Sequence, residues 1–313
     1  MYSWRWLSGD TVVTASPEFR PFQGPEHLPF KLGDGPAAIL MIHGFGGTPA
    51  ELRGLGEIFA SHGWHAEALL LPGFGSDIAN LEKTRPQDWF DAVRTDWQAM
   101  KGQHNPCILL GFSMGAAVAL NVAPNIRPDR MILAAPFWRL PGWMSGIFPI
   151  MQWFNPKIYP FKRADFNDPR LRQFLERLLP GIDLDNPGEQ EYIRKELSLP
   201  VRTINEISRM GRQAYQLAPE IKTPTLVLQG AADMVVQPAS TRRLVRRLPA
   251  PLTMYQEISG MHDMLPGQGR PIEAAGSPTD PLLRAIFDWL PIPQASVPIE
   301  QRLYTASSLG QAT

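Results

Sequence analysis

A serine flanked by glycines at residues 111–115 constrains the fold of this chain more than any other feature. The segment reads G-x-S-x-G, an apolar run precedes it, and small helix-favouring residues follow it. This order predicts a sharp turn between a strand and a helix, where glycines leave room for the neighbouring backbone. We expect Ser113 to project from the turn as a nucleophile, with the Met114 amide at the helix start facing the same space. The alternative is a glycine-rich structural turn whose serine has no catalytic role.

Short apolar runs alternate with segments of helical spacing along the chain. Such runs are typical of parallel strands that are buried on both faces. Predicted strands lie at 36–44, 64–71, 108–110, 130–135, 224–230 and 252–258, and predicted helices at 49–63, 86–100, 239–248 and 280–290. The predicted fold class is therefore α/β, with a mostly parallel central sheet flanked by helices. A functional site is expected at the carboxyl ends of the strands.

The pattern changes between residues 137 and 217. Aromatic residues and prolines crowd the first half of this segment, whereas 168–179 and 189–215 are charged and helical. We interpret 137–217 as a helical cap inserted into the core. The core then consists of 1–136, which includes an irregular or short-stranded lead-in, and 218–290. The polar residues 291–313 are predicted to form a mobile tail.

A serine nucleophile needs a base, and the base needs a carboxylate that orients it. In sheets with such a turn, the three residues follow one another as serine, acid and histidine. Of six histidines only His262 lies after Ser113, in a loop beyond the last predicted strand. Asp233 is the candidate acid because it directly follows an apolar strand. Asp129 is the alternative, although it precedes its strand, and Asp263 is interpreted as capping a turn or helix.

The glycine-rich loop at residues 43–47 is the second candidate element of this site. Attack on a carbonyl group creates an oxyanion, which needs preorganised N–H donors. The serine turn offers the Met114 amide, and the loop offers the Phe45 amide. His43 is interpreted as organising the loop by hydrogen bonding rather than as a base.

Composition excludes several classes of partner and cofactor. The 30 lysines and arginines balance 30 aspartates and glutamates, so nothing in the net charge indicates nucleic-acid binding. The histidine spacings and the single cysteine predict no metal site, and no nucleotide or other cofactor motif is recognised. No apolar run has the length of a membrane span, and the N-terminus lacks a secretory signal pattern, so a cytoplasmic protein is expected.

The tryptophans of the inserted segment have two interpretations. Trp138, Trp143 and Trp153 are candidates for the apolar lining of a substrate pocket beneath the cap. Alternatively, Trp143 and Trp153 also contact a membrane or lipid surface, since lysines and an arginine lie nearby in the sequence.

Taken together, these segments resemble the α/β-hydrolase superfamily, and most closely its bacterial carboxylesterase and monoacylglycerol-lipase-like branch, also described as serine-aminopeptidase-type hydrolases. The matching motifs are HGFGGTP at 43–49, LPGFG at 71–75, GFSMG at 111–115, GAAD at 230–233 and GMH at 260–262. The resemblance implies an α/β-hydrolase fold and hydrolysis of small-molecule esters with apolar acyl groups through an acyl-enzyme. Ser113, Asp233 and His262 would be its triad. Two alternatives stay open. One is a hydrolase or acyltransferase with the same triad that acts on thioesters, amides or carbon–carbon bonds, and the other is a non-catalytic protein of this fold that binds a lipid or a partner.

Overall fold

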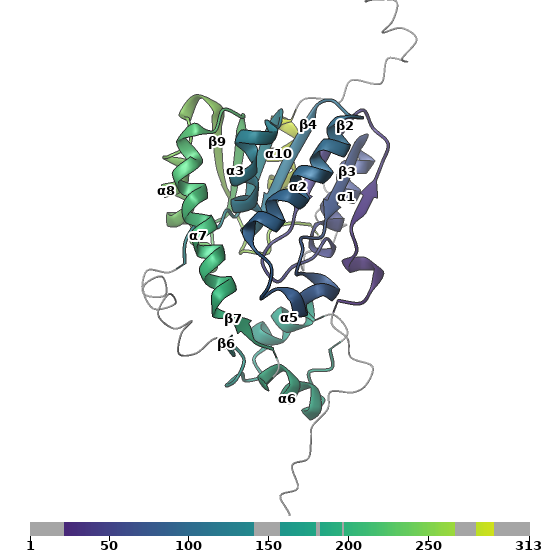
Figure 1. Cartoon of the computed structure of the whole chain (residues 1–313), viewed down its shortest axis with the longest axis vertical. Coiled ribbons are helices and arrows are strands. Elements are labelled where there is room, and N and C mark those ends of the chain that lie inside the picture. The colour runs from purple at the N-terminus through teal and green to yellow at the C-terminus, as the bar shows by residue number, and fades with distance from the viewer. Residues whose placement is uncertain (1–21, 141–156, 180–181, 196, 267–279, 291–313) are drawn as a thin grey trace, which may run out of the picture.

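A seven-stranded sheet forms the centre of the molecule. The computed structural model describes residues 22–140, 157–179, 182–195, 197–266 and 280–290. The strands of its main sheet are β1 (Phe30–Leu32), β2 (Ala37–Ile42), β3 (Trp64–Leu69), β4 (Cys107–Phe112), β5 (Arg130–Ala134), β8 (Thr225–Gly230) and β9 (Thr253–Ile258). Their order is β1-β3-β2-β4-β5-β8-β9 (Figure 1). β1 runs antiparallel to β3, and the other neighbours are parallel. The mostly parallel sheet confirms the predicted fold class.

Helices cover both faces of this sheet. They are α1 (Ala50–Ser61), α2 (Pro86–Lys101), α3 (Met114–Ile126), α7 (Val201–Leu217), α8 (Pro238–Val245) and α10 (Pro281–Trp289). Successive strand side chains point to opposite faces, so each strand contributes to two cores. Leu40 and Leu109 join the cluster under α2, α3, α7 and α8, whereas Ile39 and Ile108 join the cluster under α1 and α10. Figure 1 views the sheet from the side of α2 and α3.

The chain between β5 and β8 builds a small lobe at one end of the molecule (Figure 1). Its elements are β6 (Lys157–Ile158), α5 (Pro169–Leu178), α6 (Pro187–Lys195) and β7 (Leu199–Pro200). Leu175, Leu179 and Ile193 belong to a hydrophobic cluster of this lobe. In contrast, α7 packs against α3, where Asn121 Nδ2 donates to the Met210 carbonyl at 3.2 Å. The boundaries of a cap at 137–217 stay a prediction, and the predicted tail at 291–313 lies outside the described residues.

The continuous helical pattern predicted across residues 189–215 is wrong. The structure ends α6 at Lys195 and begins α7 at Val201, with the short strand β7 between them. Pro200 has no N–H group to donate within a helix and disfavours helical geometry at Leu199. Leu199 instead pairs with Ile158 in β6. The segments before and after this break are both charged and helical in pattern, so the sequence pattern did not reveal where α6 ends and α7 begins.

Candidate active site

The turn that carries Ser113 has the tight geometry expected from its glycines. Ser113 adopts φ 52° and ψ −113°, and it precedes the first residue of α3. Its N–H donates to the Ala134 carbonyl of the neighbouring strand at 2.9 Å. A Cβ on Gly111 would lie 2.4 Å from the Gly115 carbonyl oxygen, and one on Gly115 would lie 2.3 Å from that of Ile42. Both contacts are too short for a side chain, so the fold requires glycine at these two positions.

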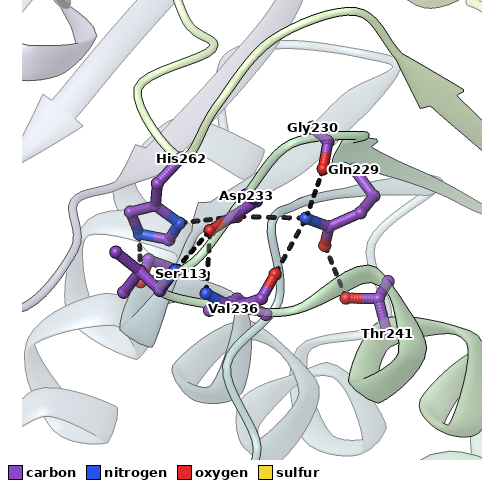
Figure 2. A network of polar contacts seen from close by, with 8 residues as sticks. Ser113, Gln229, Gly230, Asp233, Val236, Thr241 and His262 are labelled. Carbon is purple, nitrogen blue, oxygen red and sulfur yellow. Dashed lines mark hydrogen bonds and ion pairs between the residues drawn. The ribbon is translucent and has the colours of Figure 1, made fainter.

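The structure brings together the three residues predicted to form a triad. His262 Nε2 lies 3.1 Å from Ser113 Oγ, and His262 Nδ1 lies 2.8 Å from Asp233 Oδ2 (Figure 2). The residues follow β4, β8 and β9, so they meet at the carboxyl ends of parallel strands. A hydrogen on Nδ1 that donates to the carboxylate leaves Nε2 free to accept the serine proton. This arrangement has the geometry of a nucleophile, a base and an orienting acid.

The Asp233 carboxylate is fully buried and held from two sides. Its side chain has no exposed surface, whereas the His262 side chain is 21% exposed. The N–H groups of Val235 and Val236 both donate to Asp233 Oδ1 at 2.8 Å. The Ala232 N–H, in the loop that carries Asp233, donates to the Gly260 carbonyl at 2.9 Å and so connects this loop to the one that carries His262. The carboxylate therefore has a fixed direction towards the imidazole.

The alternative acid, Asp129, lies at the other end of the sheet. Its Oδ2 accepts from Lys101 Nζ at 2.6 Å and from the Cys107 N–H at 2.7 Å. Cys107 begins β4, whereas Ser113 follows the end of that strand. Asp129 thus fastens the amino end of the strand, and Asp233 is the acid that contacts His262.

The glycine-rich loop at residues 43–47 lies against the nucleophile. A Cβ built on Gly44 would be 3.3 Å from the Ser113 Cβ, and Gly47 N–H donates to the Gly44 carbonyl at 3.2 Å to close a turn. Phe45 is the next residue in this turn, and Met114 is the first residue of α3. Their assignment as oxyanion donors stays a prediction, supported by the position of the loop beside Ser113.

His43 is a structural residue that joins two loops. The Leu71 N–H donates to His43 Nε2 at 3.0 Å, so this nitrogen carries no hydrogen and the Nδ1–H donates to the Gly44 carbonyl at 2.8 Å. Burial lowers the pKa of His43 to about 4, which keeps the ring neutral. The predicted role of His43 in organising the loop by hydrogen bonding is confirmed.

Glu51 is a contact of this loop that the sequence did not reveal. Its carboxylate accepts a hydrogen bond from the Gly44 N–H, and a Cβ on Gly47 would clash with the same carboxylate. Burial raises the pKa of Glu51 to about 7. In the sequence Glu51 looks like an ordinary acid in the first turn of a helix, because nothing local indicates that its carboxylate turns back to the loop.

Glu51→Gln is expected to change how stability depends on pH. Because folding raises the pKa of Glu51 from 4.5 to about 7, its contribution to stability falls as pH rises through this window. Glutamine does not titrate. The free energy of unfolding of the variant minus that of the wild type should therefore increase between about pH 5 and about pH 8, by up to about 3 kcal/mol.

Urea unfolding at both pH values measures this difference. Glu57→Gln is the matched control, because Glu57 is an exposed glutamate on the same helix. His43 is present in all three proteins, so its own titration cancels. Parallel stability curves for Glu51→Gln and the wild type would show that Glu51 ionises normally in the folded protein.

Trp138 has a packing role in the structure. Its indole N–H donates to the Ser240 carbonyl at 2.9 Å, and its ring stacks on Tyr215 with centroids 4.1 Å apart. These contacts fix Trp138 between α8 and α7, and its place in a substrate pocket stays a prediction. Trp143 and Trp153 lie outside the described residues.

The described residues contain no group of three or more histidine, cysteine, aspartate or glutamate side chains placed to hold a metal ion. Within the same residues, no helix combines the length and the apolar character needed to cross a membrane.

The sheet topology and the serine turn define this chain as an α/β hydrolase. Residues 34–266 match the family described as serine aminopeptidase, S33. The chain belongs to this family.

Three relatives show how far the similarity extends. The chain is 27% identical, over 68% of its length and 76% of the relative's, to a thermostable monoacylglycerol lipase from Bacillus sp. (strain H-257). It is 30% identical over 103 residues, 33% of this chain and 41% of the relative, to a carboxylesterase from Bacillus subtilis (strain 168). The crystal structure of a monoacylglycerol lipase from Paleococcus ferrophilus shares the fold, with a TM-score of 0.59 and 18% identity over 83% of this chain and 96% of that one.

Proposed function

We propose that this chain is a serine hydrolase that cleaves carboxylic esters of apolar acyl groups, of the carboxylesterase or monoacylglycerol lipase type. The observation that carries the proposal is the continuous hydrogen-bond path from Ser113 Oγ through His262 to Asp233. The family match and the relatives named as monoacylglycerol lipase and carboxylesterase support the same reaction. The substrate is accordingly a small-molecule ester.

In the first half of the proposed reaction, the enzyme becomes acylated. His262 Nε2 takes the proton of Ser113 as Oγ attacks the carbonyl carbon of the ester. The carbonyl oxygen becomes an oxyanion, for which the amides of Phe45 and Met114 are the proposed donors. The intermediate then breaks the bond to the alcohol, and His262 gives its proton to the leaving oxygen. Ser113 now carries the acyl group.

The second half returns the enzyme to its starting state. His262 removes a proton from water, and the resulting hydroxide attacks the acyl carbon. The bond to Ser113 Oγ breaks, Oγ regains its proton from His262, and the carboxylic acid leaves. In both halves Asp233 stabilises the imidazolium and holds its Nδ1–H, which requires the buried, oriented carboxylate that the loop after β8 provides.

The segment 137–217 is proposed to act as a cap that lines the acyl pocket. The lobe of α5 and α6, with its own hydrophobic cluster, supports a unit distinct from the sheet. Contact of this cap with a lipid surface and a cytoplasmic location stay predictions from the sequence.

A panel of substrates tests the proposed reaction. We expect Ser113-dependent hydrolysis of p-nitrophenyl esters, with a rate that depends on acyl length from acetyl to palmitoyl, and of monoacylglycerols. Thioesters and amides that carry the best acyl group test the alternative reactions, and the Ser113→Ala protein gives the background rate of hydrolysis. Thioester or amide turnover without ester turnover would assign a different reaction to the same triad. No turnover of any member would contradict the proposal and favour a binding protein.

A further inference from the structure

A buried glutamine contacts the same carboxylate oxygen as His262. Gln229, the penultimate residue of β8, has no exposed surface. Its Nε2 donates to Asp233 Oδ2 at 3.0 Å, and His262 Nδ1 lies 2.8 Å from that same oxygen (Figure 2). Nε2 also lies 3.1 Å from the Gly230 carbonyl oxygen and 3.0 Å from the Val236 carbonyl oxygen. The amide nitrogen thus faces three acceptors at the base of the Asp233 loop.

Thr241 supplies the hydrogen-bond donor for the oxygen of this amide. Thr241 lies on α8, has no exposed surface, and its hydroxyl donates to Gln229 Oε1 at 2.5 Å. A flipped amide would place Oε1 against the oxygens of Gly230, Val236 and Asp233, none of which has a proton to donate. A buried polar group without a partner is costly, so only one orientation satisfies the site.

We propose that Gln229 and Thr241 are a positioning pair that holds the Asp233 carboxylate in its direction towards His262. This inference rests on the proposed function. Neither residue touches the substrate or the reacting atoms. Gln229 acts through Asp233, because its N–H group donates to Oδ2, the same oxygen that accepts the hydrogen bond from His262 Nδ1–H. Thr241 acts through Gln229, because its hydroxyl donates to Oε1 and holds the amide where Nε2 reaches Asp233 Oδ2.

Loss of the Thr241 hydroxyl should shift the pH dependence of kcat/KM in one direction. Without the Thr241 hydroxyl, Gln229 Oε1 loses its donor, and the side chain shifts so that the hydrogen bond from Nε2 to Asp233 Oδ2 weakens. A weaker donor leaves more negative charge on Asp233 Oδ2, the oxygen that faces His262. This charge stabilises the imidazolium of His262, so the acid limb of the profile of kcat/KM against pH should move to higher pH, by on the order of half a pH unit.

Three threonine variants test the pair. Thr241→Val keeps the shape and removes the hydroxyl, whereas Thr241→Ser keeps the hydroxyl. Thr225→Val is the matched control: Thr225 is a buried threonine of β8, 1% exposed, whose hydroxyl donates to the Thr223 carbonyl at 2.8 Å, outside the network. The measurements are kcat and KM for the best ester across pH, and the low-field NMR resonance of the His262 Nδ1–H.

Thr241→Val should lower kcat by about tenfold with little change in KM, raise the acid limb and shift the NMR resonance. Thr241→Ser should restore all three properties, and Thr225→Val should leave them at wild-type values. If Thr241→Val fails to fold, Thr241→Ala makes the same comparison without the added methyl group.

A merely structural pair would give a different result. Thr241→Val would then lose stability as Thr225→Val does, while kcat per folded molecule, the acid limb and the resonance stayed those of the wild type. That result would overturn the inference while leaving the proposed function intact. A wild-type protein without Ser113-dependent turnover would instead remove the proposed function, and the inference with it.

Discussion

Ser113→Ala is expected to lower kcat/KM for the best ester by about 10⁴-fold or more. The substitution removes only Oγ, which is the atom that lies 3.1 Å from His262 Nε2. Without it no acyl-enzyme forms, and His262 has no hydroxyl to activate. The fold should persist, because serine and alanine both place a Cβ at the same backbone geometry, φ 52°.

Steady-state turnover and thermal unfolding measure the two halves of this prediction. Ser208→Ala is the control, because Ser208 is a buried serine of α7, and its hydroxyl accepts from Arg212 Nη1 at 2.9 Å. It should keep wild-type turnover. If Ser113→Ala retained more than about one per cent of kcat/KM with its fold intact, Ser113 would not be the nucleophile.

Asp233→Asn is expected to lower kcat/KM by about 10³- to 10⁴-fold. The N–H groups of Val235 and Val236 require an oxygen at one end of the side chain, so the amide nitrogen would face His262. An N–H group there needs an acceptor, which forces the hydrogen of the imidazole from Nδ1 to Nε2. Nε2 could then no longer accept the proton of Ser113. The main fault is the wrong imidazole tautomer, and Gln229 Nε2 also loses Asp233 Oδ2 as an acceptor.

Asp129→Asn separates the two candidate acids. Asp129 pairs with Lys101 and the Cys107 N–H at the amino end of β4, so its loss should reduce stability while turnover stays within a few-fold of wild type. Turnover of both variants on the same ester gives the comparison. A greater loss of turnover in Asp129→Asn than in Asp233→Asn would mean that the acid has been misassigned.

The central features of this molecule were predictable because each follows a local rule. Glycines at 111 and 115 indicate a turn that only glycine permits, and the structure shows why through the close approach of Gly115 to Ile42. Asp233 follows an apolar strand, His262 follows the last strand, and parallel strands bring their carboxyl ends together. His262 is the single histidine that follows Ser113 in the sequence, so the expected order of serine, acid and histidine leaves no other candidate base. The local pattern and the topology therefore led to the same three residues.

The supporting contacts were not predictable, because they join segments that are distant in the sequence. Gln229 looks like any polar residue near the end of a strand, and Thr241 like a polar residue on an amphipathic helix. Their hydrogen bond exists only because α8 packs beside β8. Glu51 differs, because its partner Gly44 is near in the sequence, but nothing local shows that the Glu51 side chain turns back to the loop. Trp138 was predicted to line a pocket from its aromatic character alone, and its contacts with Tyr215 and Ser240 required the packed helices.

The role of Ser113 as the nucleophile is tested most directly with a fluorophosphonate, which forms a stable bond to an activated serine. The protein is labelled, weighed intact and digested for mass spectrometry, with the Ser113→Ala protein treated in parallel. We expect a single adduct per chain, on Ser113, together with loss of ester turnover, and no adduct in the variant. An adduct on another residue, or ester turnover that survives full labelling of Ser113, would contradict this role.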